Sequence, residues 1–275
     1  MHRLLVDTES LLSDCPTLPK EAANHLKVLR PKDGEKVELF DGKGKFRVFF
    51  YQSDRGLSPP KWGLSPYPSG VCPQSEGPVP TGVQTAERSA VGLTLFACVT
   101  KGSRWDWTIE KATELGVTRI VPVISERTIV RLSPSEYEAK RLRWQRVAED
   151  AARQSDAKWL PEIQAPVTFA ESLPLVRETM CFVGALTAPP PKAIGEALAA
   201  VNRKDFRLST FDNGEQAHLS TFIGPEGDFS PSELAALLEI ATPVSFGATI
   251  LRAETAAIYA ISAIKSYLDT IGSVS

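Results

Sequence analysis

Two stretches of this 275-residue chain decide its fold, namely FIGPEGDF at residues 222–229 and FGATILRAETA at residues 246–256. Each reads as a short apolar strand, a turn that contains glycine, and the start of a helix. Glycine adopts backbone conformations that a Cβ atom forbids, and it lets a ligand approach the main chain closely. Two such turns at neighbouring strand ends predict a pocket lined by backbone N–H and C=O groups, which suits an adenine or an amino-acid moiety.

The residues after each turn favour a helix start. Ser230 and Glu233 have the spacing of a capping box, with Pro231 at the first helical position. Glu254 falls in the first turn of the next helix, where a carboxylate complements the helix dipole. Either glycine turn alone is compatible with a tight strand–helix connection. The charges of Glu226, Arg252 and Glu254 beside apolar strand ends favour a ligand site.

Further motifs lie upstream in a fixed order. They are HLKVLR at 25–30 with FDGKG at 40–44, KGSR at 101–104 with IEKATELGV at 109–117, ERT at 126–128, and RW at 143–144 with AARQS at 151–155. Together with the two glycine turns, these motifs resemble the SPOUT RNA methyltransferases. The branch that they resemble is the RsmE type, which methylates N3 of a uridine in small-subunit (16S) ribosomal RNA.

The resemblance implies an α/β fold with two domains. A small PUA-like β-barrel that binds RNA is expected in residues 1–85, with a Pro/Gly-rich insertion at 56–82. A SPOUT methyltransferase domain with a mostly parallel sheet and a C-terminal trefoil knot is expected in residues 86–275. The resemblance also implies S-adenosylmethionine as cofactor, a homodimer, and small-subunit ribosomal RNA or the 30S particle as partner. Knotted chains are rare, and periodicity does not predict one.

The same resemblance, with the two turns, gives the expected site residues. Gly224, Gly227 and Gly247 are expected to let the backbone approach the cofactor. The full set of expected cofactor contacts is Leu186, Thr187, Ile223, Gly224, Pro225, Glu226, Gly227, Phe246, Gly247, Ile250, Leu251, Arg252 and Thr255. The expected RNA contacts are Arg3, His25, Lys27, Arg30, Lys101, Arg104, Lys111, Arg127 and Gln154.

Methylation of uridine N3 sets the chemistry expected of these residues. The N3 proton must leave before or during attack, so the nucleophile is an anion delocalised onto O2 and O4. A cation at the pocket mouth would stabilise that charge, and Arg252 is the candidate. Glu226 or Glu254 could take the proton, and the choice between them stays open. Both glutamates have a structural alternative in capping turns or in pairing with Arg252.

Other charged residues also have a structural alternative. Lys111 and Glu114 are three apart in a predicted helix and could form a surface ion pair. Lys101 and Arg104 could lie in a solvated loop, and His25 could be a structural histidine. Three positions depart from the family pattern: Asp228 replaces a second glycine, Thr249 replaces a basic residue, and Asp156-Ala157 replaces Gly-Arg, with Lys158 following.

Composition restricts the function classes. The net charge is −2, and residues 165–275 hold 7 Lys and Arg against 12 Asp and Glu. The rest of the chain carries only a small excess of basic over acidic residues. This argues against tight binding to any RNA and favours a folded RNA target. No apolar run is long enough for a signal peptide or a membrane span. The four cysteines are Cys15, Cys72, Cys98 and Cys181, and none of them has CxxC spacing. We therefore expect no metal site and expect these residues to be buried thiols in a reduced cytoplasm.

The residue pattern also predicts the order of elements. Strands 36–40 and 44–50 flank the hairpin signal Asp41-Gly42, and residues 56–82 read as a loop rather than a strand pair. The second half alternates between strands and helices, which predicts a mostly parallel sheet. Its strands are expected at 91–99, 118–124, 180–186, 219–223 and 244–246, and its helices at 104–115, 134–155, 191–201, 231–241 and 254–268.

Two functions from different classes fit these observations. The first is an S-adenosylmethionine-dependent uridine-N3 methyltransferase of small-subunit ribosomal RNA that acts on the assembled or assembling subunit. The second is a non-catalytic RNA-binding assembly factor that kept the fold. The intact glycine turns and Arg252 favour the enzyme.

Overall fold

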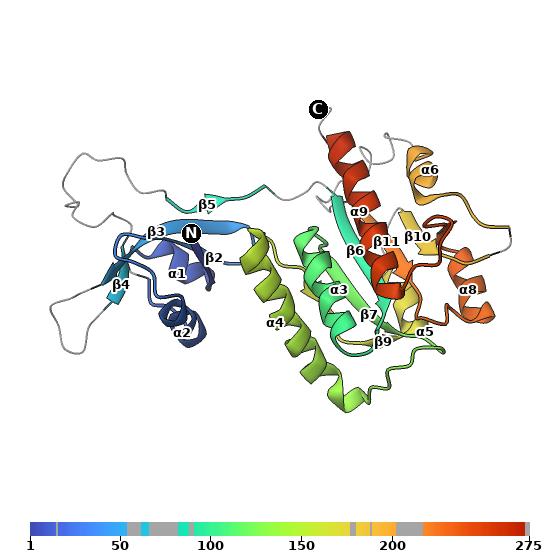
Figure 1. Ribbon diagram of the computed structural model, residues 1–275, viewed down its shortest axis with the longest axis horizontal. Coiled ribbons are helices and arrows are strands. Elements are labelled where there is room, and N and C mark those ends of the chain that lie inside the picture. Colours follow the sequence, from blue (N-terminus) through green and yellow to red (C-terminus); the bar gives the residue numbers. More distant parts are fainter. Residues whose placement is uncertain are drawn as a thin grey trace. The chain divides into compact units, whose positions relative to one another are not determined.

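The chain divides into two compact units in the computed structural model (Figure 1). The model describes residues 1–14, 16–53, 62–65, 82–87, 91–176, 180–187, 189–201 and 217–272. The first unit comprises Met1–Arg88 together with Ala152–Leu160, and the second comprises Ser89–Ala151 with Pro161–Ser275. The first unit therefore includes a short segment from the second half of the chain, whereas we expected a single domain boundary between residues 85 and 86.

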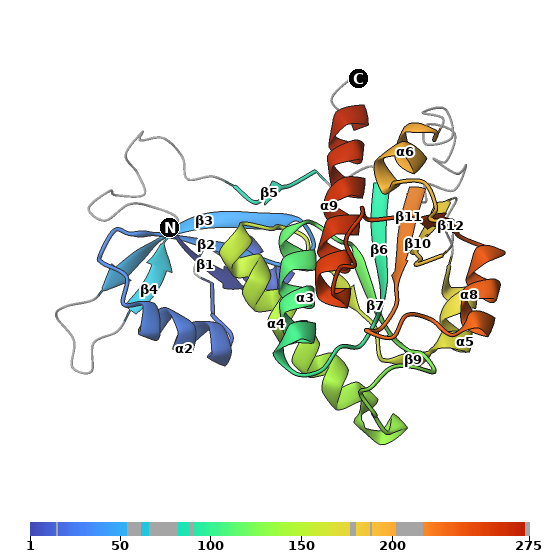
Figure 2. The same ribbon diagram turned by 45° about the vertical axis from the view of Figure 1, so that its right-hand side comes forward.

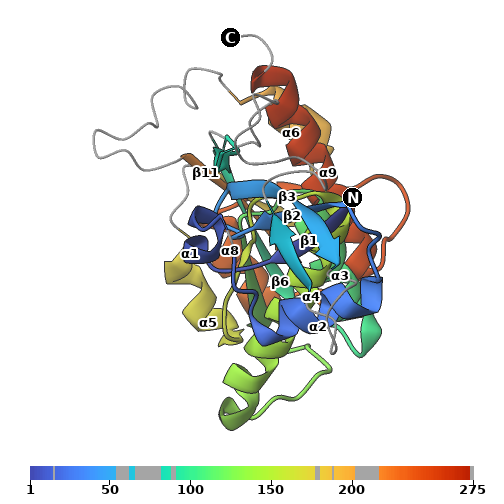
Figure 3. The same cartoon turned by 90° about the vertical axis from the view of Figure 1, so that its left-hand side faces the viewer.

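The first unit is built on a five-stranded sheet with two short helices. The strand β1 (His2–Leu5) pairs in parallel with β2 (Lys36–Phe40), which pairs antiparallel with β3 (Lys45–Ser53). The strands β4 (Trp62–Ser65) and β5 (Gln84–Thr85) both pair antiparallel with β3. Figure 3 looks onto β1, β2 and β3, with α1 (Thr8–Leu12) and α2 (Lys20–Leu29) nearby. The core between them contains Leu4, Leu26, Leu39 and Phe49.

The β2–β3 hairpin confirms the predicted turn at Asp41-Gly42. The Asp41 carboxylate accepts backbone N–H groups from Lys43 and Lys45, and Gly42 has a φ of 69°. The expectation that residues 56–82 contain no strand is wrong, because β4 lies within them; most of the remaining insertion lies outside the described residues. The helices α1 and α2 were not predicted either, although Asp7 caps α1 by accepting the N–H of Ser10.

The segment 152–160 is bonded into the first unit. The Arg3 guanidinium, only 8% exposed, pairs with Glu38 at 2.8 Å and donates to the carbonyl oxygens of Ala152 and Ala157. Lys158 reaches the same Glu38 carboxylate at 2.6 Å. The donors of Arg3 are therefore committed to this buried network, which fixes the segment, and an RNA contact of Arg3 stays a prediction.

The second unit contains a seven-stranded parallel sheet with helices on both faces. The strand order is β12 (Thr242–Val244), β10 (Met180–Gly184), β11 (Ala217–Ile223), β6 (Val91–Cys98), β7 (Arg119–Ile124) and β8 (Glu162–Ile163), with β9 (Val167–Thr168) also on β7. Figure 2 shows α3 (Ser103–Glu114) beside α9 (Ala253–Gly272), and α5 (Phe169–Ser172) and α8 (Pro231–Leu238) away from that pair. The predicted α/β class and parallel sheet are confirmed.

Strand alternation places two apolar cores on the two faces of this sheet. Leu95 and Ala97 pack in a cluster with residues of α3, α9, α4 (Tyr137–Ser155) and α6 (Ile194–Ala199). Phe96 and Cys98 point to the opposite cluster, where the rings of Phe96 and Phe222 stack 4.4 Å apart. A sheet covered on both faces exposes its carboxyl edge as the place where polar groups can gather.

The element bounds in the second unit follow the sequence expectations closely. The capping box of α8 is present, with the Ser230 hydroxyl accepting the Glu233 N–H and the Glu233 carboxylate accepting the Ser230 N–H. The short β8, β9 and α5, the turn Leu173–Leu175 and the turn Pro134–Glu136 that precedes α4 were not predicted as separate elements. The trefoil knot stays a prediction.

Two of the four cysteines belong to the described residues. Cys98 and Cys181 are buried thiols, as expected from their apolar strand neighbours. Burial raises the pKa of the Cys98 thiol to about 12, so this thiol stays protonated at neutral pH. Cys15 and Cys72 lie outside the described residues. Among the helices that the structure describes, none is long and apolar enough to cross a membrane.

Candidate active site

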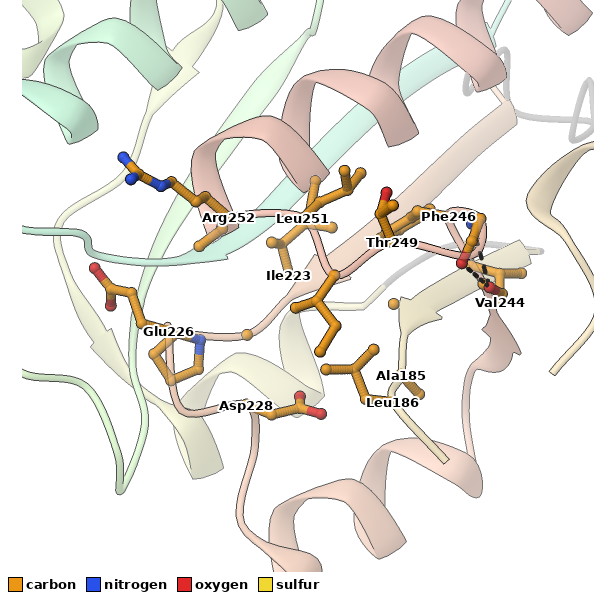
Figure 4. Close-up of a pocket in the computed structure, with 18 residues that line it drawn as sticks. Ala185, Leu186, Ile223, Glu226, Asp228, Val244, Phe246, Thr249, Leu251 and Arg252 are labelled. Carbon is orange, nitrogen blue, oxygen red and sulfur yellow. Dashed lines mark hydrogen bonds between the residues drawn. The ribbon is translucent and has the colours of Figure 1, made fainter. Parts of the chain in front are cut away.

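A cavity of about 250 Å³ opens at the carboxyl ends of β10, β11 and β12 (Figure 4). The two glycine turns line it, and they are joined there by the end of β10 at Gly184, Ala185 and Leu186. The walls combine apolar side chains such as Ile223 and Leu251 with exposed main chain. The predicted juxtaposition of the two turns is therefore present in the structure.

The first turn, Gly224–Phe229, is held by contacts from the end of β7. The Arg127 guanidinium donates to the carbonyl oxygen of Gly227 at 2.9 Å and to that of Phe229 at 3.4 Å. Glu233, at the start of α8, accepts the backbone N–H of Glu126 at 2.9 Å. The ERT motif therefore holds this turn in shape through the Arg127 side chain and the backbone of Glu126.

Asp228 takes the backbone conformation that the family pattern assigns to glycine. Its φ is 59°, in the left-handed region that aspartate tolerates better than most residues. Its carboxylate accepts the N–H of Phe229 at 2.8 Å and lies along the cavity wall in Figure 4. The substitution thus preserves the turn and adds a negative charge to the pocket.

The second turn depends on Gly247. Its φ is +113°, a backbone angle that a residue with a Cβ atom rarely adopts. The Ser245 hydroxyl lies 3.3 Å from both the backbone nitrogen and the carbonyl oxygen of Gly247. A Cβ atom at Gly184 would lie 2.4 Å from the Phe246 ring, so glycine there allows Phe246 to fold over β10.

A cluster of charges lies at the mouth of this cavity. Arg104, near the start of α3, has its guanidinium 3.4 Å from the Glu226 carboxylate and 3.9 Å from that of Glu254. The Glu254 side chain is only 11% exposed, and its Oε2 is buried with no hydrogen-bond partner among the described residues. Arg252 is exposed, and its guanidinium lies apart from Glu226 in Figure 4. The structure pairs the two glutamates with Arg104 and not with Arg252.

Most of the expected cofactor residues line the cavity. Those that do are Leu186, Ile223, Gly224, Pro225, Glu226, Phe246, Gly247, Ile250, Leu251 and Arg252. Thr187, Gly227 and Thr255 do not, although each is next to a lining residue in the sequence or close to one. The lining residues that sequence reasoning missed are Gly184, Ala185, Asp228, Val244, Ser245, Thr249, Ala253 and Ala256. The small residues among them carry no sequence signal beyond their place at predicted strand ends.

The expected RNA residues other than Arg3 fall into three environments. The first environment is exposed surface. His25 and Lys27 lie on α2 and Arg30 at its end, rather than on a strand. Lys101 precedes α3, Gln154 lies in the last turn of α4, and both are also exposed. Lys111 lies 2.8 Å from both Glu110 and Glu114, so the alternative of a surface ion pair is present. Arg104 and Arg127 contact the cofactor turns, as described above.

A metal site is absent from the part of the chain that the structure describes: no cluster of three or more His, Cys, Asp or Glu side chains there could hold an ion. The polar groups that line the cavity are its backbone groups, Arg252 and the carboxylates of Glu226 and Asp228, and the Glu254 carboxylate lies at its mouth.

Comparison with known proteins gives two family matches. Residues 87–265 match an RNA methyltransferase domain, and residues 18–56 match an RNA methyltransferase PUA domain. The ribosomal RNA small subunit methyltransferase E of Synechocystis is 30% identical over 271 residues, which are 98% of this chain and 78% of that protein. The protein of the same name from Bacillus subtilis is 31% identical over 165 residues, 60% of this chain and 61% of that protein.

A solved structure shows the same fold. It is the ribosomal RNA small subunit methyltransferase E from Neisseria gonorrhoeae bound to S-adenosyl methionine. It superposes with a TM-score of 0.72 at 26% identity and covers 97% of both chains.

Proposed function

The chain belongs to the RNA methyltransferase family that includes ribosomal RNA small subunit methyltransferase E, and on this basis we propose the reaction that it catalyses. The protein transfers a methyl group from S-adenosylmethionine to N3 of one uridine in small-subunit (16S) ribosomal RNA. It acts in the cytoplasm on the assembled or assembling 30S particle. Residues 1–85, with their PUA-like part, bind RNA, and residues 86–275 form the knotted methyltransferase domain.

The observation that carries this proposal is the cavity formed by the two glycine turns. Ile223, Leu251 and Leu186 offer apolar walls to an adenine ring, and the exposed main chain at Gly224 and Gly247 offers polar partners for its edge. A Cβ atom at Gly224 would come within 3.1 Å of the Asp228 carboxylate and 3.3 Å of the Phe229 ring, so a larger residue there would require these side chains to shift. S-adenosylmethionine supplies an electrophilic methyl group on a positively charged sulfur.

The protein's own residues prepare the uridine. Removal of the N3 proton leaves an anion on the pyrimidine ring, and the exposed Arg252 at the pocket mouth stabilises that charge. Arg104 lies beside the Glu226 and Glu254 carboxylates, one of which accepts the proton. The uridine must be unpaired or flipped out to reach the cavity, because a stacked base is inaccessible.

A cofactor titration separates this proposal from a non-catalytic assembly factor. Calorimetry with S-adenosylmethionine is expected to show one site per chain, and purified small subunits are expected to incorporate one methyl group each. A protein that binds small subunits but neither binds the cofactor nor transfers a methyl group would be an assembly factor instead.

RNA affinity should depend on the basic end of α2. The exposed Lys27 and Arg30 are available to phosphates, so Lys27→Ala with Arg30→Ala is expected to weaken RNA binding. The slope of log affinity against log salt should fall by about 1 for each lost phosphate contact. Filter binding at several salt concentrations measures both effects, with Lys20→Ala at the other end of α2 as the control. An unchanged salt slope would remove α2 from the RNA surface.

A symmetric homodimer is proposed as the working form. The helix α9 buries Ile261, Ile264 and Leu268 within its own domain, while Tyr259, Ile250 and Leu186 remain exposed near the pocket. Apolar side chains of that kind are typical of an interface, and closed twofold assemblies are the commonest oligomers. Light scattering at micromolar concentration is expected to give twice the mass of the 30.0 kDa chain. The mass of a single chain would contradict the dimer.

A further inference from the structure

A second cavity, of about 320 Å³, lies in the same unit at the junction of β6, α3 and α4. It is lined by Thr100 after β6, by Trp105 and Asp106 of α3, and by Lys140 and Arg143 of α4. None of its lining residues belongs to the first cavity. None of these five residues was expected to have a function.

Three polar atoms in this lining are buried without a hydrogen-bond partner among the described residues. They are the hydroxyl of Thr100, the indole N–H of Trp105 and Oδ1 of Asp106. Thr100 and Trp105 are 3% and 2% exposed. Folded proteins pair nearly all buried polar groups, and each exception calls for an explanation such as a bound molecule. Three exceptions around one cavity indicate a site that a polar ligand completes.

The same cavity carries positive charge. Lys140 is half-buried in its wall, and the Arg143 guanidinium donates to Oδ2 of Asp106, which fixes that carboxylate and leaves Oδ1 without a partner. Gly102, with a φ of +68°, precedes the first turn of the twelve-residue helix α3, whose N–H groups favour an anion. Donors, an acceptor and cations together suit a ligand with a polar ring and a phosphate.

The position of the cavity relates it to the proposed reaction. The strand β6 lies next to β11 in the sheet, and both cavities open at the carboxyl edge of these parallel strands. Arg104 precedes the cavity residue Trp105 on α3 and reaches Glu226 in the wall of the first cavity. A single-stranded RNA with its uridine at the first cavity would place a neighbouring nucleotide near the second.

We infer that the second cavity binds one nucleotide of the RNA substrate other than the methylated uridine. The inference rests on the proposed function. The base meets the Thr100 hydroxyl, the Trp105 N–H and the Asp106 carboxylate, since every Watson–Crick edge carries both a donor and an acceptor. Its phosphate lies toward Lys140. The cavity thereby helps to select the target, and its volume falls near the lower end of ligand pockets, about 300 Å³.

Two substitutions test this site by removing one polar group each. Thr100→Val keeps the shape of the side chain and removes the hydroxyl, and Lys140→Ala removes the nearby charge. Each is expected to weaken binding of small subunits about fivefold, the effect of one lost hydrogen bond or ion pair. The cofactor affinity and the methylation rate at saturating subunits should not change. Arg141→Ala is the matched control, because Arg141 is the next residue, carries the same charge and pairs with Glu138 outside the cavity.

The outcomes distinguish this inference from the proposed function. Weaker subunit binding in Thr100→Val and in Lys140→Ala, but not in Arg141→Ala, supports the nucleotide site. If both variants bind subunits as tightly as the unaltered protein, the cavity holds only water and the inference is overturned, whether or not methylation occurs. If the unaltered protein transfers no methyl group yet the cavity variants lose affinity, the nucleotide site stands and the proposed reaction fails.

Discussion

Arg252→Ala is expected to lower the rate of methyl transfer at saturating RNA by about a hundredfold, the usual cost of removing one donor that stabilises an anionic transition state. The charge of Arg252 matters most when the uridine becomes anionic, so the loss should appear in the saturated rate. Arg252 lines the cavity and makes no ion pair with Glu226 or Glu254, which bond to Arg104 instead. Single-turnover kinetics on purified small subunits measure this rate directly.

Arg252→Lys provides the control for this variant. Lysine keeps the charge but loses the planar fork of donors, so a partial recovery of the rate is expected. If Arg252→Ala instead weakened only the apparent affinity for RNA and left the saturated rate intact, Arg252 would be a binding residue without a catalytic role.

Gly247→Val is expected to abolish measurable binding of S-adenosylmethionine while the fold survives. The φ of +113° at Gly247 is strained for any residue with a Cβ atom, and a β-branched side chain adds bulk where the turn lines the cavity. Isothermal calorimetry measures the affinity, and circular dichroism checks the fold. Gly195→Ala is the control, because Gly195 lies in α6 with no atom within 4 Å of a built Cβ. Unchanged cofactor affinity in Gly247→Val would separate this turn from the cofactor.

The structure favours Gly247 over Gly227 as the position for this test of cofactor binding. The sequence pattern suggested Gly227 equally, yet Gly227 does not line the cavity. A Cβ atom there would meet the Arg127 side chain at 3.6 Å, an ordinary contact distance. The motif shows that both glycines belong to the turns, but only the backbone angles show which of them the turn requires.

Local patterns predicted the second unit well because its elements depend on local signals. Apolar strands, glycine turns and the Ser230–Glu233 capping box each act within a few residues, and the alternation of strands and helices determines the parallel sheet. The same reasoning located the cavity, since the carboxyl ends of neighbouring parallel strands meet at one edge. The short β8 and β9 were missed because two residues carry no periodicity.

Long-range partners explain what local patterns did not predict. Arg3 looks like an unpaired cation in the sequence, and only folding brings it to Glu38 and to the carbonyl oxygen of Ala152, 149 residues away. Arg104 was expected to contact RNA or to lie in a solvated loop, and the fold brings it to Glu226, 122 residues away. Strand β4 was missed because its four residues lie among prolines and glycines, and its partner β3 provides the pairing.

The most direct test of the proposed reaction is mass spectrometry of small-subunit ribosomal RNA from cells that lack this protein. The RNA is measured before and after the subunits are incubated with the purified protein and S-adenosylmethionine. One uridine is expected to lack its N3 methyl group before incubation and to carry it afterwards. An RNA from these cells that is already fully methylated at uridine N3, or a methyl group that appears on another atom, would contradict this expectation.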